Sequence, residues 1–517
     1  MPKSLSTLPF ATQLGVAAPL SPTAALAPPS ERTWPNAAHD VLNQRARGFG
    51  LVNAPDMQRY LNGLYARIKT QAGVSDWPGE VHVLASDSLQ AFATGAGNLY
   101  VSMSWLISIQ SEDEIVALLS HEFGHVYLHY HQLEGAVADA DTATGWLAMG
   151  VAVAKKTAQA TGWTDVDTLT TAYALGRGLV TTVYARSQER AADNFGLNIS
   201  LKLGYSYEHG MKAFLERMAS WEEMNERREK DQQEKILLAV REQALISNAE
   251  SSKTANNSLS QTLSKSTGEL GANVNSALQQ IIFDFNNAAS KMRSDHPPIV
   301  ERIDDLALSM ASSSDSQTQK EPVTLPLETA RRAKHTAALI ASYTLAFKAI
   351  GNPKDPLSPD LAHRSVSGVT ATHAVPLFAL YIVSNSQAPT KGKQKIDHGK
   401  IFEANFNSEP DRAWKIYQER SLRLKEERQP SAAKKVMEQG LSYFQNAEEA
   451  WLDGIRFYGE TQGWEDAKRM AQICKNKFRR VALRCTQAAI SPVELANAER
   501  KDKERADQIV NKLFKKR

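Results

Sequence analysis

Cysteine is nearly absent from this sequence. Only two of its 517 residues are cysteines, Cys474 and Cys485, which is too few for the disulfide framework of a small secreted domain. On one continuous helix their spacing corresponds to a rise of roughly 16 Å, which is too far for a bridge. A disulfide therefore requires a helix–turn–helix between them, and two free structural thiols are the alternative.

The sequence also has no long hydrophobic run. Its best candidate, residues 145–154, has about half of the length that a transmembrane helix needs, so we expect it to pack in a core or at a surface. Residues 8–27 are mostly small and apolar, and residues 25–27 (Ala-Leu-Ala) resemble a signal-peptidase site. Prolines interrupt this run, and Lys3 is the only basic residue before it. Residues 1–30 are therefore either a cleaved leader or a disordered tail.

A strong charge of either sign is missing as well. The net charge is +3, which gives no indication of nucleic-acid binding. With 42% hydrophobic and 23% charged residues, the composition is that of an ordinary globular protein, and the length predicts two or more domains. Residues 500–517 are rich in Lys and Arg, but acids interleave them, which favours a solvated terminal helix.

Local patterns predict the elements that precede the main motif. Apolar residues recur at helical spacing over residues 56–70, and residues 80–85 and 98–102 have the composition of strands. The glycine-bearing segment 91–97 predicts a turn, so we expect the two strands to form a hairpin. Ser111 and Glu114 make a capping box, at which a further helix begins.

That helix carries the sequence His121-Glu122-Phe123-Gly124-His125, an HExxH motif. On a helix, histidines at i and i+4 project from one face, and two neutral imidazoles in that geometry can ligate one Zn²⁺. Glu122 lies beside the water that such a metal holds. The motif therefore predicts a metallopeptidase if the chain supplies a third ligand.

Two histidines downstream are weak candidates for that ligand. His131 has the ten-residue spacing of the longer HExxHxxGxxH motif. However, Leu128 stands where that motif needs a glycine to break the helix. His129 lies a turn beyond His125, where it can hardly share the same ion.

Glu189 is the stronger candidate. Glu189 and Asp193 are at i and i+4, so their carboxylates share a helical face. We expect Glu189 to ligate zinc and Asp193 to accept a hydrogen bond from a ligand histidine. A surface pair of acids is the alternative, but Ala191 and Ala192 allow the close helix packing that a shared site requires.

The pairing of HExxH with a downstream ExxxD helix resembles the zinc peptidase family that includes HtpX and the CAAX prenyl endopeptidases. Residues 90–102, 186–193 and 296–303 resemble further segments of that family, and the resemblance covers roughly residues 50–306. Gln90 replaces the family's usual Asn, and Ala185 precedes Arg186. The resemblance implies a gluzincin fold, with one Zn²⁺ per chain on His121, His125 and Glu189.

The tail beyond the resemblance has a helical pattern with one internal repeat. Residues 433–437 align with residues 467–471, and Phe444 aligns with Phe478, at an offset of 34 residues. This is the period of tetratricopeptide repeats, and an unrelated helical bundle is the alternative. With no membrane-spanning segment and a repeat-like tail, the chain resembles the soluble BepA-type members of the family. That resemblance implies a bacterial periplasm and misassembled outer-membrane proteins as substrates.

We therefore predict an α+β fold, mostly α. A zinc peptidase domain over residues 31–308 contains a small sheet and a flexible loop over 247–268. A linker over 309–322, rich in Ser, and an α-helical, tetratricopeptide-like domain over 323–517 follow it.

The mechanism assigns further residues. Glu122 is expected to take a proton from the water and pass it to the leaving amine. The strand over residues 98–102, with Asn98 and Tyr100, is expected to hold substrate as an added β-strand. His296 is the candidate donor to the oxyanion. The alternative is a cap or loop histidine before a Pro-Pro turn, with Arg302 as a structural ion-pair partner.

A second hypothesis assigns the chain to a different functional class. A chaperone-like or adaptor protein would bind clients through its helical tail while the metal site is idle or structural. Both hypotheses give the chain unfolded or misassembled proteins and tail-binding proteins as partners, and neither includes nucleic acid. Peripheral association with a membrane stays open.

Overall fold

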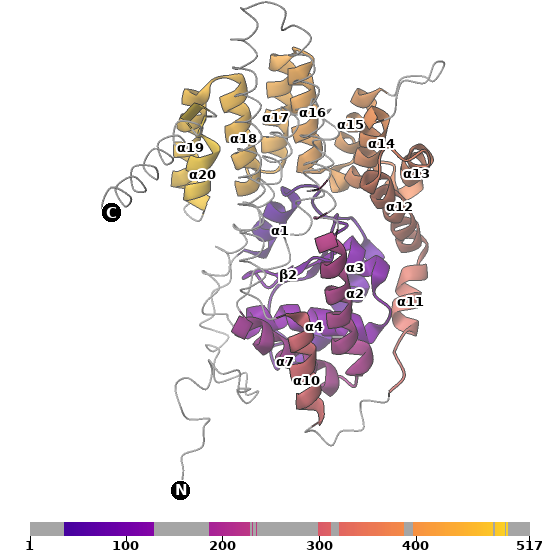
Figure 1. The fold of residues 1–517 in the computed structure, drawn as a ribbon. Coiled ribbons are helices and arrows are strands. Elements are labelled where there is room, and N and C mark those ends of the chain that lie inside the picture. The colour runs from indigo at the N-terminus through magenta and orange to yellow at the C-terminus, as the bar shows by residue number, and fades with distance from the viewer. Residues whose placement is uncertain are drawn as a thin grey trace, which may run out of the picture. The chain divides into compact units, whose positions relative to one another are not determined.

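The structure is a computed structural model, which describes residues 36–128, 186–227, 230, 234, 298–311, 320–386, 397–478, 481–491 and 493–494 (Figure 1). Several predicted features lie outside the described residues: the leader over 1–30, the apolar stretch 145–154, the loop 247–268, the basic stretch 500–517 and the histidines at 129, 131 and 296.

The chain divides into two compact units. Unit 1 comprises Met1–Asp40 and Leu51–Asp411, and unit 2 comprises Val41–Gly50 and Arg412–Arg517. The described residues form many helices and one three-stranded sheet, which confirms the predicted fold class of α+β, mostly α. The division into a peptidase domain over 31–308, a linker over 309–322 and a helical domain over 323–517 stays a prediction.

The first helix that lies wholly within unit 1 is α2, Pro55–Gln71, which confirms the predicted helix. Pro55 suits the first turn of a helix, because its missing N–H has no intrahelical partner there. Met57, Leu61, Leu64 and Ile68 are buried. Their i, i+4, i+7 and i+11 spacing therefore turns one apolar stripe toward the core.

The sheet has the strand order β1-β3-β2, with β1 at Val81–Leu84, β2 at Ala91–Ala93 and β3 at Leu99–Ser102. β3 pairs in parallel with β1 and antiparallel with β2. The predicted hairpin between residues 80–85 and 98–102 is therefore wrong, because the expected turn segment contains a strand of its own.

The hairpin that does form joins β2 to β3 through residues 94–98. Thr94 N donates to Asn98 O at 3.0 Å. Gly97 has φ +83°, and a Cβ there would come within 2.2 Å of Pro78 O, so this turn requires glycine. Only these few residues make the turn, and Ala91–Ala93 is left to form the edge strand.

The motif helix α4, Glu112–Leu128, begins as the capping pattern predicts. Ser111 Oγ accepts a hydrogen bond from Glu114 N at 3.1 Å, while the Glu114 carboxylate accepts from Gln110 N at 2.9 Å. Glu112, Asp113 and Glu114 are all buried, and the positive end of the helix dipole favours carboxylates at this position.

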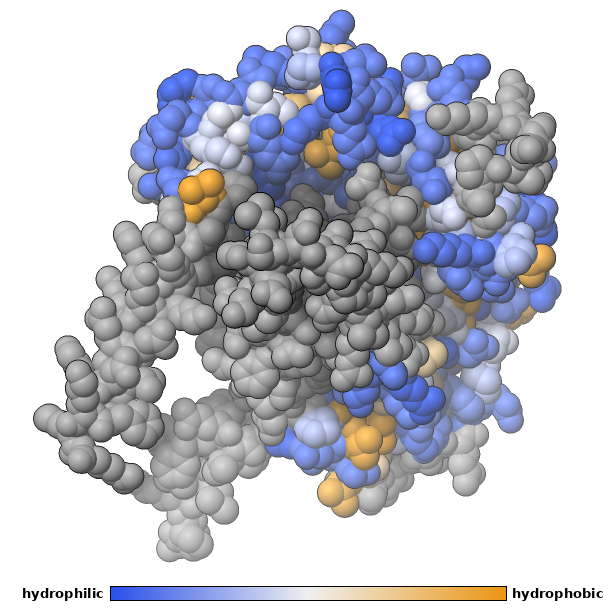
Figure 2. Space-filling model, turned by 45° about the horizontal axis from the view of Figure 1, so that its top comes forward, coloured by the Kyte–Doolittle hydropathy of each residue, from blue (hydrophilic) through white to orange (hydrophobic). Residues whose placement is uncertain are grey.

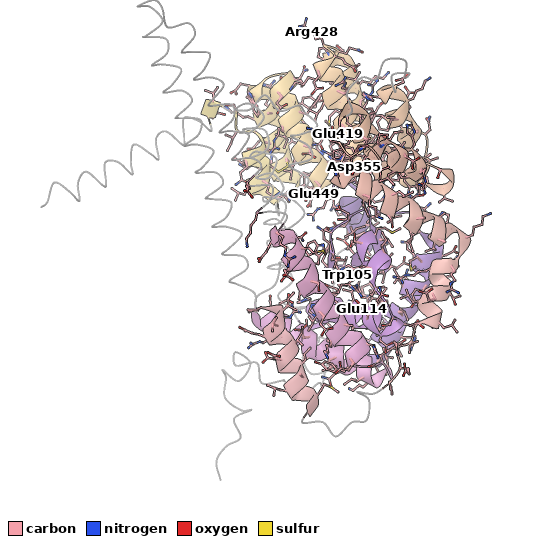
Figure 3. All side chains as sticks on the ribbon, turned by 45° about the vertical axis from the view of Figure 1, so that its right-hand side comes forward. Trp105, Glu114, Asp355, Glu419, Arg428 and Glu449 are labelled. Atoms are coloured by element: carbon pink, nitrogen blue, oxygen red, sulfur yellow. A yellow bond between two sulfur atoms is a disulfide. The ribbon has the colours of Figure 1, made fainter. Side chains whose placement is uncertain are left out.

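Each of these three carboxylates has a hydrogen-bond or ion-pair partner elsewhere in unit 1. Glu112 accepts from the hydroxyl of Tyr60, Asp113 accepts from Ser206 N, and Glu114 pairs with Arg217. Figure 3 labels Glu114 together with Trp105, a buried residue of the neighbouring helix α3, Met103–Ser108. The start of α4 is therefore fixed by buried polar contacts as well as by its cap.

Three elements follow around α4: α7 at Arg186–Lys202, η5 at Glu208–Lys212 and α10 at Ile299–Ala311. α7 lies along α4, η5 also contacts α4, and α10 packs on α7 (Figure 1). The α2 helix and the sheet contact α4 as well. The motif helix is therefore the central element of this part of unit 1.

The remainder of unit 1 is helical. Its elements are α11 (Leu325–Arg332), α12 (Lys334–Gly351), α13 (Ser358–Ser365), η7 (Gly368–Thr370), α14 (Ala374–Ser386), α15 (His398–Phe406) and η8 (Glu409–Asp411). α12 contacts α13 and α14, and α14 contacts α15. Buried Tyr343 and His373 are hydrogen-bonded to each other in this group, at 3.1 Å.

The described residues of unit 2 form two helix pairs and one further short helix after Arg412. These helices are α16 (Trp414–Glu426), α17 (Pro430–Tyr443), α18 (Glu448–Thr461), α19 (Trp464–Lys477) and α20 (Ala482–Ala488). α16 packs on α17, and α18 packs on α19. The first helices of the two pairs begin 34 residues apart, as do the second helices.

The aligned residues of the sequence repeat take equivalent positions in these pairs. Ala433 and Ala467 are both fully buried, and Phe444 and Phe478 are buried just beyond the ends of α17 and α19. Equal spacing and equal burial support a repeated helical hairpin.

The two cysteines form a disulfide. Their Cα atoms lie 5.9 Å apart, because α19 ends at Lys477 and α20 begins at Ala482. The chain therefore has the helix–turn–helix that the spacing made necessary for a bridge. Both cysteines belong to the buried cluster at this end of unit 2.

On the face shown in Figure 2, the described surface is mostly hydrophilic, and its apolar side chains form small separate patches. Within the described ranges, no helix combines the length and the hydropathy that a bilayer crossing requires.

Candidate metal centre

Three potential metal ligands converge between α4 and α7. His121 and His125 lie on α4, Glu189 lies on α7, and all three are buried. The two histidine Nε2 atoms are 3.1 Å apart. Glu189 places one carboxylate oxygen 3.6 Å from His121 Nε2 and the other 3.5 Å from His125 Nε2.

These distances fit a small tetrahedral cation. With zinc bonds of 2.0–2.1 Å, tetrahedral ligand atoms lie about 3.3 Å apart. The two histidine nitrogens are 3.1 Å apart, and each has one Glu189 oxygen at 3.5 or 3.6 Å. Two imidazoles and one carboxylate are also a ligand set that catalytic zinc takes. The residues present therefore fit zinc in donor chemistry and in spacing.

Small residues allow α4 and α7 to approach this closely. A Cβ on Gly124 would lie 3.3 Å from the Cα of Ala192, which is itself fully buried. A Cβ on Gly196 would lie 3.0 Å from His121 N. Gly124, Ala192 and Gly196 therefore set the distance between the ligands.

Asp193 and Arg302 contact the ligands on the side away from the expected metal position. Asp193 Oδ1 lies 3.0 Å from His121 Nδ1, so the carboxylate can orient the ring and leave Nε2 toward the centre. Arg302, from α10, donates to both oxygens of Asp193 at 2.7 Å. It also lies 2.9 Å from Glu189 Oε2.

Burial and charge shift the pKa values of this group. Burial disfavours the charged form of Asp193, but the charge of Arg302 and the hydrogen bonds from His121 and Arg302 lower its pKa to about 2. Burial also opposes protonation of His121, but the neighbouring Asp193 and Glu189 raise its pKa overall. The two carboxylates therefore favour a positive charge in this centre, and a bound metal cation would supply one.

Glu122 lies inside the same buried group. Burial raises its pKa to about 7, Glu189 adds to the rise, and His121 and Arg302 oppose it. Among the described residues, Glu122 Oε2 has no hydrogen-bond partner. A buried carboxyl group with an unmatched oxygen and a near-neutral pKa is suited to proton transfer.

The two residues expected to bind substrate lie elsewhere. Asn98 and Tyr100 are buried, and both donate to the carboxylate of Asp40. Their strand, β3, is the centre of the sheet and is paired on both sides. The expected addition of a substrate strand beside residues 98–102 is therefore wrong, because β3 has no free edge.

His296 and Arg302 are the remaining residues predicted near the site. His296, the candidate oxyanion donor, lies outside the described residues. Arg302 was expected to be a structural ion-pair partner, and its contacts to Glu189 and Asp193 give it a place beside the ligands. Its separation of 109 residues from Asp193 left no spacing signal that could have indicated this contact.

An HExxH helix packed on a helix that supplies a buried glutamate is the arrangement of a metallopeptidase centre. Residues 55–309 match peptidase family M48. This part of the chain is an M48 peptidase domain, of a family whose members are metallopeptidases. The match contains both halves of the site, α4 and α7, together with α10 apart from its last residues.

The chain is also similar to curated proteases. The "Beta-barrel assembly-enhancing protease" of Escherichia coli (strain K12) is 24% identical over 181 residues, which are 35% of this chain and 36% of that protein. The "Putative beta-barrel assembly-enhancing protease" of Vibrio cholerae serotype O1 is 23% identical over 175 residues, or 33% and 34% of the two chains. The similarity therefore spans about a third of the length of each relative.

Proposed function

We propose that this chain is a zinc-dependent endopeptidase that hydrolyses misfolded or misassembled proteins of the cell envelope. The observation that carries the proposal is the buried cluster of His121, His125 and Glu189, whose spacing fits zinc. These three residues would hold one ion per chain. Asp193 would keep the His121 ring in place by accepting its Nδ1–H.

Zinc, when bound there, supplies Lewis-acid activation of a water molecule and of the scissile carbonyl. Glu122 is the general base in this proposal, because it follows His121 directly and its Oε2 has no partner among the described residues. It accepts the proton of the attacking water and returns it to the leaving amine. His296 is proposed to donate to the oxyanion, on the strength of the sequence resemblance alone.

The substrate backbone is proposed to pair with β2. Within the described residues, β2 pairs only with β3, so its other edge is free, and β2 contacts the motif helix α4. On the β3 side, Gln90 O accepts from Ser102 N, and Thr94 N donates to Asn98 O just before β3. Backbone groups alternate along a strand, so those of Ala91 and Ala93 face the free edge. Pairing through backbone groups gives sequence-tolerant binding, which suits a protease for unfolded clients.

The envelope location has three supports. The relatives are named for β-barrel assembly, the sequence resembles periplasmic members of the family, and the disulfide Cys474–Cys485 suits an oxidising compartment. The helix pairs of unit 2 are proposed to be tetratricopeptide-like and to bind clients or partner proteins. The alternative, a chaperone-like adaptor with an idle metal site, shares this last feature and differs only in the chemistry.

The decisive experiment measures metal content and cleavage on the same protein. The full chain is purified, its metals are quantified by mass spectrometry, and an unfolded outer-membrane β-barrel protein is offered as substrate. We expect one zinc per chain and cleavage by the wild type. Glu122→Gln should keep the zinc and lower cleavage by at least about 100-fold.

Glu216→Gln is the matched control, because Glu216 is an exposed glutamate of unit 1, and it should behave as the wild type. Full cleavage by Glu122→Gln would overturn the role of Glu122. A zinc-loaded wild type that binds unfolded clients but cleaves none would favour the adaptor. A chain that binds no zinc would refute the metal centre itself.

A further inference from the structure

Asp40 lies beside the turn that connects β2 to β3. Its Oδ2 accepts three hydrogen bonds, from Thr94 Oγ1 at 2.8 Å, Asn98 Nδ2 at 2.8 Å and Tyr100 Oη at 2.7 Å. Thr94 directly follows β2, and Tyr100 is paired with Phe92 in the middle of it. One carboxylate oxygen therefore holds both arms of the hairpin that contains the free edge.

The contact extends across the sheet through aromatic rings. Tyr100 stacks on Phe92 of β2, with ring centroids 5.1 Å apart, and on His82 of β1, at 5.4 Å. Because the Tyr100 hydroxyl is bonded to Asp40, the carboxylate also fixes the central ring of this stack. Asp40 therefore contacts the edge strand by two routes, through Thr94 and through the Tyr100–Phe92 pair.

Asp40 is the last residue of its segment that belongs to unit 1. It lies on α1, Ala37–Arg45, and the residues that follow it, Val41–Gly50, belong to unit 2. We call Val41–Gly50 the strap. The chain returns to unit 1 at Leu51 and Val52, where Val52 N donates to Val83 O of β1 at 2.7 Å. Residues directly before and directly after the strap are therefore hydrogen-bonded to the three-stranded sheet or its hairpin turn.

Within unit 2 the strap is held by specific bonds. Arg47 donates to Glu449 at 2.7 Å, Arg45 donates to the Tyr443 hydroxyl at 2.9 Å, and Lys415 N donates to Gly48 O at 3.0 Å. Glu449, labelled in Figure 3, also receives two bonds from Arg484, at 2.8 and 3.0 Å. Glu449 is buried, so its bond to Arg47 is weakly screened by solvent.

We propose that the strap couples unit 2 to the substrate-binding edge strand, with Asp40 as the positioning residue at its end. This inference rests on the proposed function, because it assumes that β2 receives the substrate and that unit 2 binds clients. Tension or displacement of the strap, when unit 2 binds a client, changes how firmly Asp40 holds Thr94 and Tyr100. Client binding in unit 2 thereby regulates the order of the edge strand, whereas the metal ligands on α4 and α7 are untouched.

Hydrogen exchange in the full chain tests the coupling without requiring activity. Arg47→Gln severs the strap from Glu449 and changes nothing in unit 1. We expect it to raise amide exchange over residues 91–102 by about tenfold, as local opening becomes easier. Asp40→Ala should raise the same amides at least as much, and Asp40→Asn, which keeps an acceptor oxygen, should lie between Asp40→Ala and the wild type.

Arg484→Gln is the matched control. It removes an arginine from the same Glu449 carboxylate, but it leaves Arg47 and the strap in place. We expect faster exchange in unit 2 and no change over residues 91–102. If Arg484→Gln altered the hairpin as much as Arg47→Gln, general loosening of unit 2 would explain the effect and the coupling would be refuted.

The double variant Arg47→Gln with Asp40→Ala tests whether the two residues act on the hairpin through one path or independently. Two changes on one path are not additive, so the double variant should exchange as fast as Asp40→Ala alone. Full additivity would refute the coupling, as would an unchanged hairpin in Arg47→Gln.

Kinetics on quenched-fluorescent casein supply the second readout. Arg47→Gln should raise KM about tenfold and keep kcat within about twofold, because only binding at the edge strand is changed. A lower kcat with an unchanged KM would overturn the proposal. If the wild type cleaved nothing, the proposed function would fail, while the exchange experiment would still decide whether the strap acts on the hairpin.

Discussion

Gly196 of α7 lies directly against the backbone of His121 in α4. A Cβ added to Gly196 would be 3.0 Å from His121 N, 3.2 Å from His121 Cα and 2.6 Å from Cε of Met211. The methionine end can move aside, but the backbone of a central helix cannot. The same helix α7 carries Glu189, so the fit at Gly196 sets where the third ligand lies.

Gly196→Ala should therefore weaken metal binding. The added methyl group forces α7 away from α4 by a few tenths of an ångström and moves Glu189 from the two histidines. We expect an affinity for zinc about tenfold lower, measured by competition with a chelating dye. Gly63→Ala is the matched control in α2. Its Cβ would meet nothing within 4 Å, so it should keep zinc affinity and raise stability by up to about 1 kcal/mol.

Removal of the carboxylate behind His121 should also lower metal affinity. Asp193→Ala takes away the group 3.0 Å from His121 Nδ1, so the ring loses its fixed orientation. Loss of such a partner typically costs about 10–100-fold in metal affinity, and equilibrium dialysis would measure this. Asp305→Ala, which removes a surface partner of Arg190, should leave affinity unchanged. Equal affinities in the two variants would contradict the role of Asp193.

The edge strand can be tested by backbone substitution. Ala91→Pro removes an N–H that faces the free edge, and the bonds between β2 and β3 remain. We expect a KM about tenfold higher, with zinc content and folding retained. Phe92→Pro removes a group on the β3 side of the strand and should destabilise the hairpin itself. An Ala91→Pro variant with wild-type KM would show that the substrate does not pair there.

Unit 2 should lose stability in acid through Glu449. Burial opposes its charge, but Arg47 and Arg484 lower its pKa to about 2 in the folded chain, against an ordinary value of 4.5 when unfolded. Because the pKa of Glu449 is lower in the folded chain than in the unfolded chain, its charge stabilises the fold at pH values above about 4.5. This stabilisation is lost as the pH falls from about 4.5 toward 2. The pKa difference corresponds to about 3 kcal/mol at neutral pH.

Glu449→Gln should remove that part of the acid dependence and lower stability at pH 7. Urea unfolding followed by circular dichroism between pH 2.5 and 7 measures both effects. Asp193 also has a depressed pKa, so the comparison is the difference between variant and wild type. Glu460→Gln, which breaks the more exposed pair with Lys425, should have a much smaller effect. A wild-type pH profile in Glu449→Gln would contradict this assignment.

Reduction of the disulfide should loosen the end of unit 2 and leave the peptidase centre intact. Closing a loop of this length stabilises by about 3 kcal/mol in the chain-entropy model. Cys474→Ser with Cys485→Ser should therefore speed amide exchange in α19 and α20. Zinc content should stay at the wild-type value. Unchanged exchange in these helices would mean that packing of the buried cluster alone holds α20.

The sequence by itself determined the local parts of the site. The i, i+4 spacing of His121 and His125 puts both rings on one helical face in any fold, and the Ser111 cap starts that helix. The same rule placed Glu189 and Asp193 on one face of a second helix. The repeat period of 34 residues likewise followed from the chain alone, because each helix pair must bury the same positions.

Tertiary structure decided what the local patterns left open. The sequence predicts a hairpin between residues 80–85 and 98–102, but the hairpin joins β2 and β3. Composition does not show which strands pair or in which direction. The sequence predicts Asn98 and Tyr100 as substrate contacts, yet both are buried and donate hydrogen bonds to Asp40, about sixty residues earlier. Arg302 reaches Glu189 and Asp193 from a helix more than a hundred residues away. Such contacts depend on how helices and strands pack, and packing between distant segments leaves no periodic signal in a single sequence.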